Sequence, residues 1–157
     1  MTTRSLILAG LLALMTVALG SVPGLTGANP PSASGSGKFK VNGNERTFSF
    51  SAIQQPKGTV AGQAQLHNNA TGTDLHMAID CLNFLGPNRV VVSGKITKSN
   101  VPGTEGMTGT FEALDNGDGS QSPPDELSQL AVGGGTCQSP FSLGTIPITQ
   151  GAIQVRP

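Results

Sequence analysis

The chain has few aromatic residues and few charges, and it contains neither tryptophan nor tyrosine. Of its 157 residues, 4% are aromatic and 11% are charged, and nine basic residues balance nine acidic ones. A nucleic-acid-binding surface needs clustered cations, and binding to single strands also needs aromatic rings on which bases stack. The composition provides neither feature, so we expect no nucleic-acid partner.

The sequence also lacks the short motifs of common catalytic sites. It contains no Gly-x-Ser-x-Gly elbow, no P-loop, no Cys-x-x-Cys pair and no His-Glu-x-x-His sequence. We therefore expect that the protein is not an enzyme. The remaining catalytic alternative is a Ser–His–Asp site assembled from residues distant in the sequence.

One long apolar run is present, and it lies at the start of the chain. Residues 6–19 are almost entirely apolar and follow a single basic residue, Arg4. This arrangement is typical of a secretory signal peptide, and a run of about 14 residues is short for a membrane-spanning helix. Small residues permit cleavage after Gly20 or after Ala28. We expect residues 1–28 to be a signal peptide, the protein to be secreted into the periplasm or the extracellular space, and no transmembrane anchor to be present.

The rest of the chain divides into a short leader and one domain. Residues 29–36 are rich in Pro, Gly and Ser, a composition that buries too little apolar surface to offset the entropy of ordering. They are predicted to form a flexible leader. Residues 37–157 are sufficient for one domain with one core.

Only two cysteines occur, Cys81 and Cys137, and both lie in the part of the chain that we expect to be exported. Oxidising compartments favour disulfide bonds, so we predict a Cys81–Cys137 disulfide. The alternative is two free, buried thiols.

Apolar and polar residues alternate with a period of two along most of the chain, as in strands with one buried face. Turn-forming residues separate the runs, and no segment of the expected mature chain shows helical spacing with a cap. The pattern predicts an all-β fold. We expect an antiparallel meander of about eight strands that closes into a small barrel, with a β-sandwich as the alternative.

The registers of successive predicted hairpins agree with one another. Pairing residue 52 with 60, 66 with 75, 81 with 90 and 96 with 107 places apolar residues or glycines on one continuous face. Asn42 and Gly43 suit a two-residue turn that sets Lys40 opposite Glu45. The last strands fall within residues 125–132 and 145–155. The apolar residues predicted to face inward are Phe39, Phe48, Phe50, Val60, Leu66, Leu75, Met77, Ile79, Cys81, Val92, Ile96, Met107 and Phe111.

Several short motifs resemble those of a known group of domains. They are Gly35-Ser-Gly, Phe48-Ser-Phe50, Gly58-Thr-Val-Ala-Gly62-Gln, Val92-Ser-Gly94, Phe111-Glu-Ala-Leu-Asp115-Asn-Gly-Asp118 and Gly151-Ala-Ile-Gln-Val155. Over about residues 35–155 the chain is similar to the Gly-rich β-domains of large secreted bacterial surface proteins, which often lie beside polycystic-kidney-type or laminin-G-like modules. The resemblance implies no known activity.

Four acidic residues gather in residues 115–126 and form a candidate calcium or partner loop. Calcium prefers several oxygen ligands on a flexible loop, but Leu114 would occupy the first ligand position of an EF-hand and excludes that motif. The alternative is a turn whose Asp and Asn side chains bond to their own backbone. The acids are Asp115, Asp118, Asp125 and Glu126.

A second, weaker candidate lies on the predicted outer face. The register places His67 opposite Asp74, with His76 diagonal to His67, and two histidines with a carboxylate can hold zinc. The alternative is a solvated cluster that binds nothing. Apart from these two possibilities, we expect no cofactor.

Three classes of function follow from these features. The first is an exported, non-catalytic interaction or structural module with an unknown partner at the cell surface or outside the cell. The second is a β-barrel carrier of a small apolar ligand, because eight strands leave room for one. A secreted enzyme is a distant third. The predicted inward positions include no polar group that would orient a ligand, which favours the first class.

Overall fold

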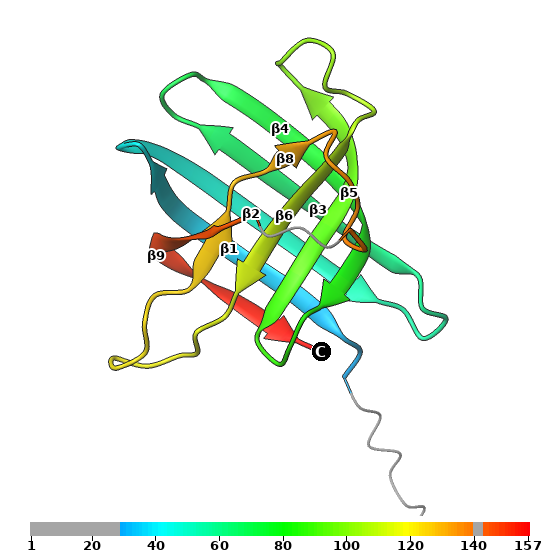
Figure 1. Ribbon diagram of the computed structural model, residues 1–157, viewed down its shortest axis with the longest axis vertical. Coiled ribbons are helices and arrows are strands. Elements are labelled where there is room, and N and C mark those ends of the chain that lie inside the picture. The colour runs from blue at the N-terminus through cyan, green and yellow to red at the C-terminus, as the bar shows by residue number, and fades with distance from the viewer. Residues whose placement is uncertain (1–28, 140–142) are drawn as a thin grey trace, which may run out of the picture.

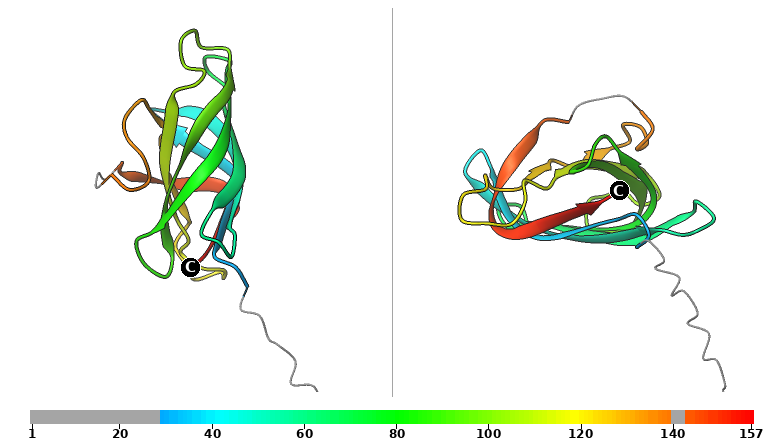
Figure 2. Two further views of the ribbon diagram at one scale, coloured as in Figure 1. Left: turned by 90° about the vertical axis from the view of Figure 1, so that its right-hand side faces the viewer. Right: turned by 90° about the horizontal axis from the view of Figure 1, so that it is seen from below.

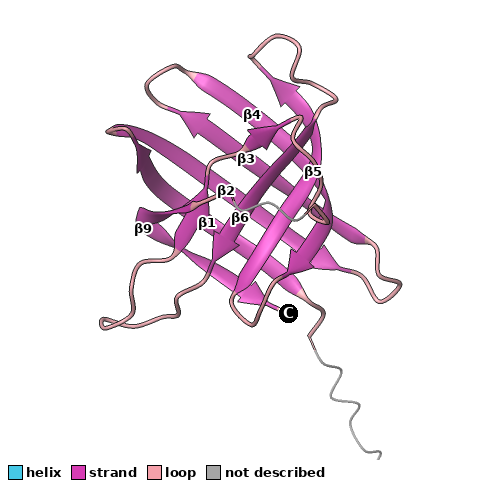
Figure 3. Cartoon of the chain, viewed as in Figure 1, coloured by secondary structure: helices cyan, strands magenta, loops and turns pink. Residues whose placement is uncertain are grey.

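The computed structural model describes residues 29–139 and 143–157, so the predicted signal peptide lies outside the described residues. These residues form strands joined by turns and loops (Figures 1 and 3). Among them, no helix is long and apolar enough to cross a membrane. The strands are β1 (Ser32–Val41), β2 (Asn44–Gln54), β3 (Val60–Asn68), β4 (Thr73–Phe84), β5 (Arg89–Ser99), β6 (Thr108–Leu114), β7 (Glu126–Ser128), β8 (Ala131–Val132) and β9 (Thr145–Arg156).

Eight of the strands close into an antiparallel barrel, which confirms the predicted fold. Each strand from β1 to β6 pairs with the next, and β9 pairs with both β7 and β1. The view along the ring in Figure 2 shows this closure. Every strand of the ring therefore has two neighbours, although β7 pairs with only residues 145–147 of β9.

The additional strand, β8, continues β7 along the same partner. On β6, Ala113 lies opposite Leu127 and Thr110 lies opposite Ala131. Three steps along β6 therefore match four steps along the β7–β8 segment, which holds one extra residue. Such an extra residue bends a strand, as a β-bulge does.

The core is an aromatic cluster inside the barrel. Phe39, Phe48, Phe50 and Phe111 are all buried, and successive ring centroids lie 6.0, 6.3 and 5.1 Å apart. Most of the predicted inward positions are confirmed. The prediction for Met107 is wrong: it lies in the turn before β6 and is 39% exposed.

The predicted flexible leader is wrong over its second half, because β1 begins at Ser32 rather than near residue 37. Ala33 is buried, and Gly35 pairs with both Phe50 and Ile153. A Cβ atom on Gly35 would lie 2.9 Å from side-chain carbons of these two residues. The glycines and serines that resemble a linker in composition therefore allow β1 to pack between β2 and β9.

Two of the four predicted registers are confirmed. The β2–β3 register is wrong by two residues, and the β4–β5 register is wrong by two to three residues. Leu66 faces Leu75 and Gly94 faces Gly109 as predicted. Between β2 and β3, residue 52 pairs with 62 instead of 60, because residues 55–59 form a loop closed by a 2.7 Å hydrogen bond from Gln55 N to Thr59 O. Between β4 and β5, register shifts follow His76 and Ile79.

The second register shift changes the position of Cys81, which was predicted to face inward. After the shift Leu82 is buried in the core, and Cys81 lies on the outer face, where it forms the predicted disulfide with Cys137 at a Cα–Cα distance of 5.9 Å. The disulfide fixes residues 133–139, which we call the strap, against the outside of β4, β5 and β6. Figure 2 shows this segment outside the barrel wall.

Candidate functional site

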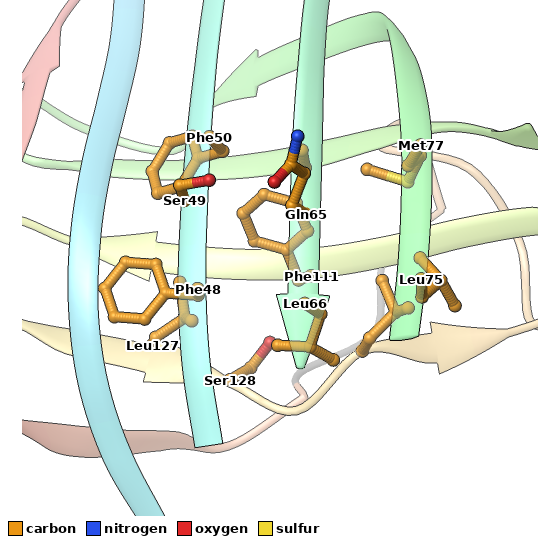
Figure 4. A pocket seen from close by; sticks show the side chains of 12 residues that line it. Phe48, Ser49, Phe50, Gln65, Leu66, Leu75, Met77, Phe111, Leu127 and Ser128 are labelled. Carbon is orange, nitrogen blue, oxygen red and sulfur yellow. The ribbon is translucent and has the colours of Figure 1, made fainter. Parts of the chain in front are cut away.

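The interior of the barrel is filled by side chains. Residues from β2, β3 and β4 meet residues from β6 and β7 on the opposite wall, as Figure 4 shows. The cavity that remains between them is about 30 Å³. Ligand pockets are usually at least about 300 Å³, whereas a space of this size suits a water molecule or two. A ligand site therefore has to be sought on the outside of the barrel.

The outer face of β9, β1, β2 and β3 carries a regular array of uncharged polar residues, which we call the polar face. One row across the strands contains Gln154, Ser34, Ser51 and Gln63, and the next contains Ala152, Ser36, Ser49 and Gln65. These residues line a shallow recess of about 420 Å³. All of them are exposed except Ser34, which is half-buried.

The polar groups of this face are largely unused by the fold. Among the described residues, Gln154 accepts a 3.0 Å hydrogen bond from Arg156. The hydroxyl and amide groups of the other polar-face residues make no side-chain hydrogen bond within the described part of the chain. They remain available to solvent or to a partner.

Charged and titratable residues border the polar face, and four of them form two pairs. Lys38 Nζ lies 3.0 Å from the Glu45 carboxylate. His67 and Asp74 occupy the corresponding row on β3 and β4, where His67 Nδ1 lies 2.6 Å from Asp74 Oδ1. The polar face itself carries no charged residue, so it suits an uncharged partner better than an ionic one.

Of the three residues in the weaker metal candidate, the structure pairs two, His67 and Asp74, and places the third, His76, beside them. His67 faces Asp74 as predicted, and His76 is diagonal to His67 because it faces Gln65. All three border a recess of about 150 Å³ beside Thr47. In the described parts of the chain, however, no three His, Cys, Asp or Glu side chains are placed to hold a metal ion. The arrangement is a hydrogen-bonded His–Asp pair on a sheet surface.

Two acids of the candidate calcium loop bond to the backbone instead of gathering around an ion site. Asp125 Oδ1 accepts from Asn116 N at 2.8 Å, and Asp125 Oδ2 accepts from Ile153 N at 2.7 Å. Asp115 Oδ1 accepts from Gly117 N at 2.8 Å, as in an Asx turn. These contacts agree with the alternative of a backbone-bonded turn.

The remaining acids of the loop point elsewhere. Asp118 is exposed, and Glu126 accepts a hydrogen bond from Thr145 on β9. The four acids therefore serve different parts of the structure, and none of their described contacts places them around a common point.

Sequence reasoning missed a buried carboxylate on the outer face of β6. Glu112 lies on the outward side of β6 yet is 1% exposed, and it forms an ion pair with Arg89 on β5. Its hydrogen bond raises the pKa of Arg89, and burial acts in the opposite direction. The alternating pattern assigns Glu112 to solvent, and nothing in it signals that a later segment covers this face.

Comparison with known proteins identifies no relative: no protein-family model, no curated protein and no solved structure matches the chain. The functional interpretation therefore rests on the residues and their geometry.

Proposed function

We propose that this protein is an exported, non-catalytic interaction module that binds its partner through the polar face. The observation that carries the proposal is the array of uncharged hydroxyl and amide groups that surround a recess of about 420 Å³ and, apart from Gln154, make no side-chain hydrogen bond within the described residues. The other conspicuous polar groups have structural partners: Asp115 and Asp125 bond to backbone N–H groups, and Glu112 pairs with Arg89.

The carrier alternative receives less support from the same geometry. A small apolar ligand would have to displace the aromatic cluster, because the cavity of about 30 Å³ is far smaller than such a molecule. The disulfide fits an oxidising compartment, and a role outside the cytoplasm is part of the proposal.

The test of the proposed function is saturable binding of the purified protein to the cell-envelope fraction of its source organism. Gln65→Arg places a long cation in the polar face, and Gln121→Arg makes the same change in the exposed loop after β6. We expect wild type and Gln121→Arg to sediment with the envelope and Gln65→Arg to remain in solution. Absence of saturable binding, or equal binding by all three proteins, would contradict the proposal.

A further inference from the structure

We propose that the partner is a neutral, hydroxyl-rich polymer, that is, a polysaccharide without charged groups. It would lie across the strands along the rows of the polar face. This inference rests on the proposed function and specifies the chemistry of the partner at the same site.

The geometry of the face suits a chain-like partner. Neighbouring strands lie about 4.8 Å apart, so a row across β9, β1, β2 and β3 extends over roughly 14 Å. The second row runs parallel to the first, two residues further along each strand, at a distance of roughly 7 Å. A partner that follows the rows can meet a hydrogen-bonding group at nearly every strand: Gln154, Ser34, Ser51 and Gln63 in one row, and Ser36, Ser49 and Gln65 in the other.

The chemistry of the face points to alcohol groups on the partner. A serine hydroxyl both donates and accepts hydrogen bonds, and a glutamine amide also offers both functions. Sugar hydroxyls have the same dual character, so each can pair with either side chain in either direction. An anionic partner would instead call for Arg or Lys in the face. The nearest cations at its borders, Lys38 and Arg156, are engaged with Glu45 and Gln154.

Other classes of partner fit the face less well. An extended peptide binds by adding a strand to an open sheet edge, whereas β1, β2 and β3, which carry most of the polar face, are each paired on both sides. Protein interfaces have cores enriched in aromatic residues, Met and Arg, and the rows contain none of these. A lipid requires an apolar patch. Among the described residues, Ile53 on β2 is the one exposed large apolar side chain beside the rows, and a single side chain does not make a patch. The other exposed large apolar residues, Leu85, Val101, Met107 and Val132, belong to other parts of the molecule.

The lack of an aromatic platform sets the expected strength of binding. Without a ring on which a sugar can stack, each contact is a solvent-competed hydrogen bond of small net value. We therefore expect dissociation constants in the millimolar range for short oligosaccharides. A polymer that presents many identical units binds more tightly through repeated engagement.

The first experiment measures migration in native gels that contain a soluble polysaccharide. The panel holds three neutral polymers, a β-glucan, a mannan and a galactan, and one anionic polymer, alginate. The test variant is Ser49→Ala/Gln65→Ala, and the matched control is Ser120→Ala/Gln121→Ala in the exposed loop after β6. Equal thermal melting temperatures establish that both variants are folded.

We expect at least one neutral polymer to retard the wild type and the loop control, and alginate to retard neither. The apparent affinity of the polar-face variant should fall at least tenfold. The inference is overturned if no neutral polymer of the panel retards the wild type, or if Ser49→Ala/Gln65→Ala is retarded as strongly as the wild type.

A second experiment separates this inference from the proposed function. The envelope fraction is treated with periodate, which cleaves vicinal diols of sugars, or with protease, before the sedimentation assay. Loss of binding after periodate alone supports a polysaccharide partner. Binding that survives periodate and disappears after protease overturns the polysaccharide inference and leaves the interaction module standing. No binding to the untreated envelope overturns the proposed function itself.

Discussion

Two aspartate side chains accept hydrogen bonds from backbone N–H groups of β9, whereas elsewhere in the barrel a neighbouring strand accepts such bonds. The pairing of β7 with β9 covers three residue pairs, from Glu126 with Pro147 to Ser128 with Thr145. Further along β9, Asp125 Oδ2 accepts from Ile153 N at 2.7 Å, and Asp115 Oδ2 accepts from Val155 N at 2.9 Å. The carboxylates thus satisfy backbone donors that have no strand partner on this side, so the acidic character of the loop has a structural origin.

Replacement of Asp125 should therefore destabilise the protein strongly. Asp125→Ala leaves the N–H groups of Asn116 and Ile153 without their acceptor in a site where Asp125 is only 9% exposed. Two lost hydrogen bonds of this kind should lower the free energy of unfolding by about 3 kcal/mol. Urea denaturation measures the change. Asp125→Asn keeps one carbonyl acceptor and should lose less, and an Asp125→Ala protein as stable as wild type would contradict this role.

The same contacts give an expectation for calcium. Because Asp115 and Asp125 are engaged by the backbone, we expect a thermal melt in millimolar calcium to coincide with one in chelator. Asp118 is exposed, so Asp118→Asn should change stability by less than about 0.5 kcal/mol. A calcium-dependent rise in the melting temperature that disappears in Asp118→Asn would restore the metal interpretation, since a ligand that binds the native state stabilises it.

At the level of the strands, alternation predicts which face a residue occupies, but it does not determine its exact partner. The register between β2 and β3, and that at Met77 and Ile79 between β4 and β5, differ from prediction by two residues, and a shift of two keeps these side chains on their faces. The aromatic core was therefore predictable despite those errors. The polar positions of β1, β2 and β3 follow from the same alternation, because Ser49 and Ser51 flank the inward Phe50.

A shift of one residue has the opposite effect, and the sequence around Cys81 gives no sign of it. The irregularity after Ile79 moves Cys81 outward, so the disulfide and the strap lie outside the barrel rather than within it. Burial of Ser93, Thr110 and Glu112 depends on segments distant in the sequence, such as Gly135, which accepts a hydrogen bond from Thr110. Local patterns hold no information on such long-range cover.

β5 approaches β4 closely at Gly94, so a side chain added at this position should destabilise the protein. A Cβ atom there would lie 2.0 Å from Ala78 O and 2.7 Å from Ile79 Cα, both in the backbone of β4. Gly94→Ala must separate β4 from β5 and should cost about 3 kcal/mol or more in a denaturant melt. Gly86→Ala is the control, because a Cβ atom at Gly86 has no neighbour within 4 Å. Equal stability of the two variants would show that the strands can adjust to the added methyl group.

On the scale of the whole molecule, the two sides of the barrel differ in what covers them. The strap is held against β4, β5 and β6 by the disulfide and by hydrogen bonds from Cys137 N to Ser93 Oγ and from Asn83 Nδ2 to Cys137 O, each 2.9 Å long. The opposite wall, formed by β9, β1, β2 and β3, presents the polar face. The fold thus leaves one broad wall available for binding.

Loss of the disulfide should destabilise the protein as a whole. Cys81 and Cys137 are 56 residues apart, and release of a loop of that length costs about 4 kcal/mol in the chain-entropy model. The double variant Cys81→Ser/Cys137→Ser should unfold at a correspondingly lower denaturant concentration. Addition of reductant should destabilise the wild type and leave the double variant unchanged. A wild type that is insensitive to reductant, or that titrates two thiols when denatured without reduction, would contradict the prediction.

The position of β9 in the ring also bears on how the chain folds while it is being synthesised. β1 and β9 pair over most of their length although they are the first and the last strands of the barrel in sequence order. Until residues 145–156 arrive, a nascent chain exposes the unpaired backbone of β1 and of β7, and such edges readily recruit strands of other chains. Between the synthesis of β1 and that of β9, this protein is therefore most prone to aggregate by strand pairing with neighbouring copies.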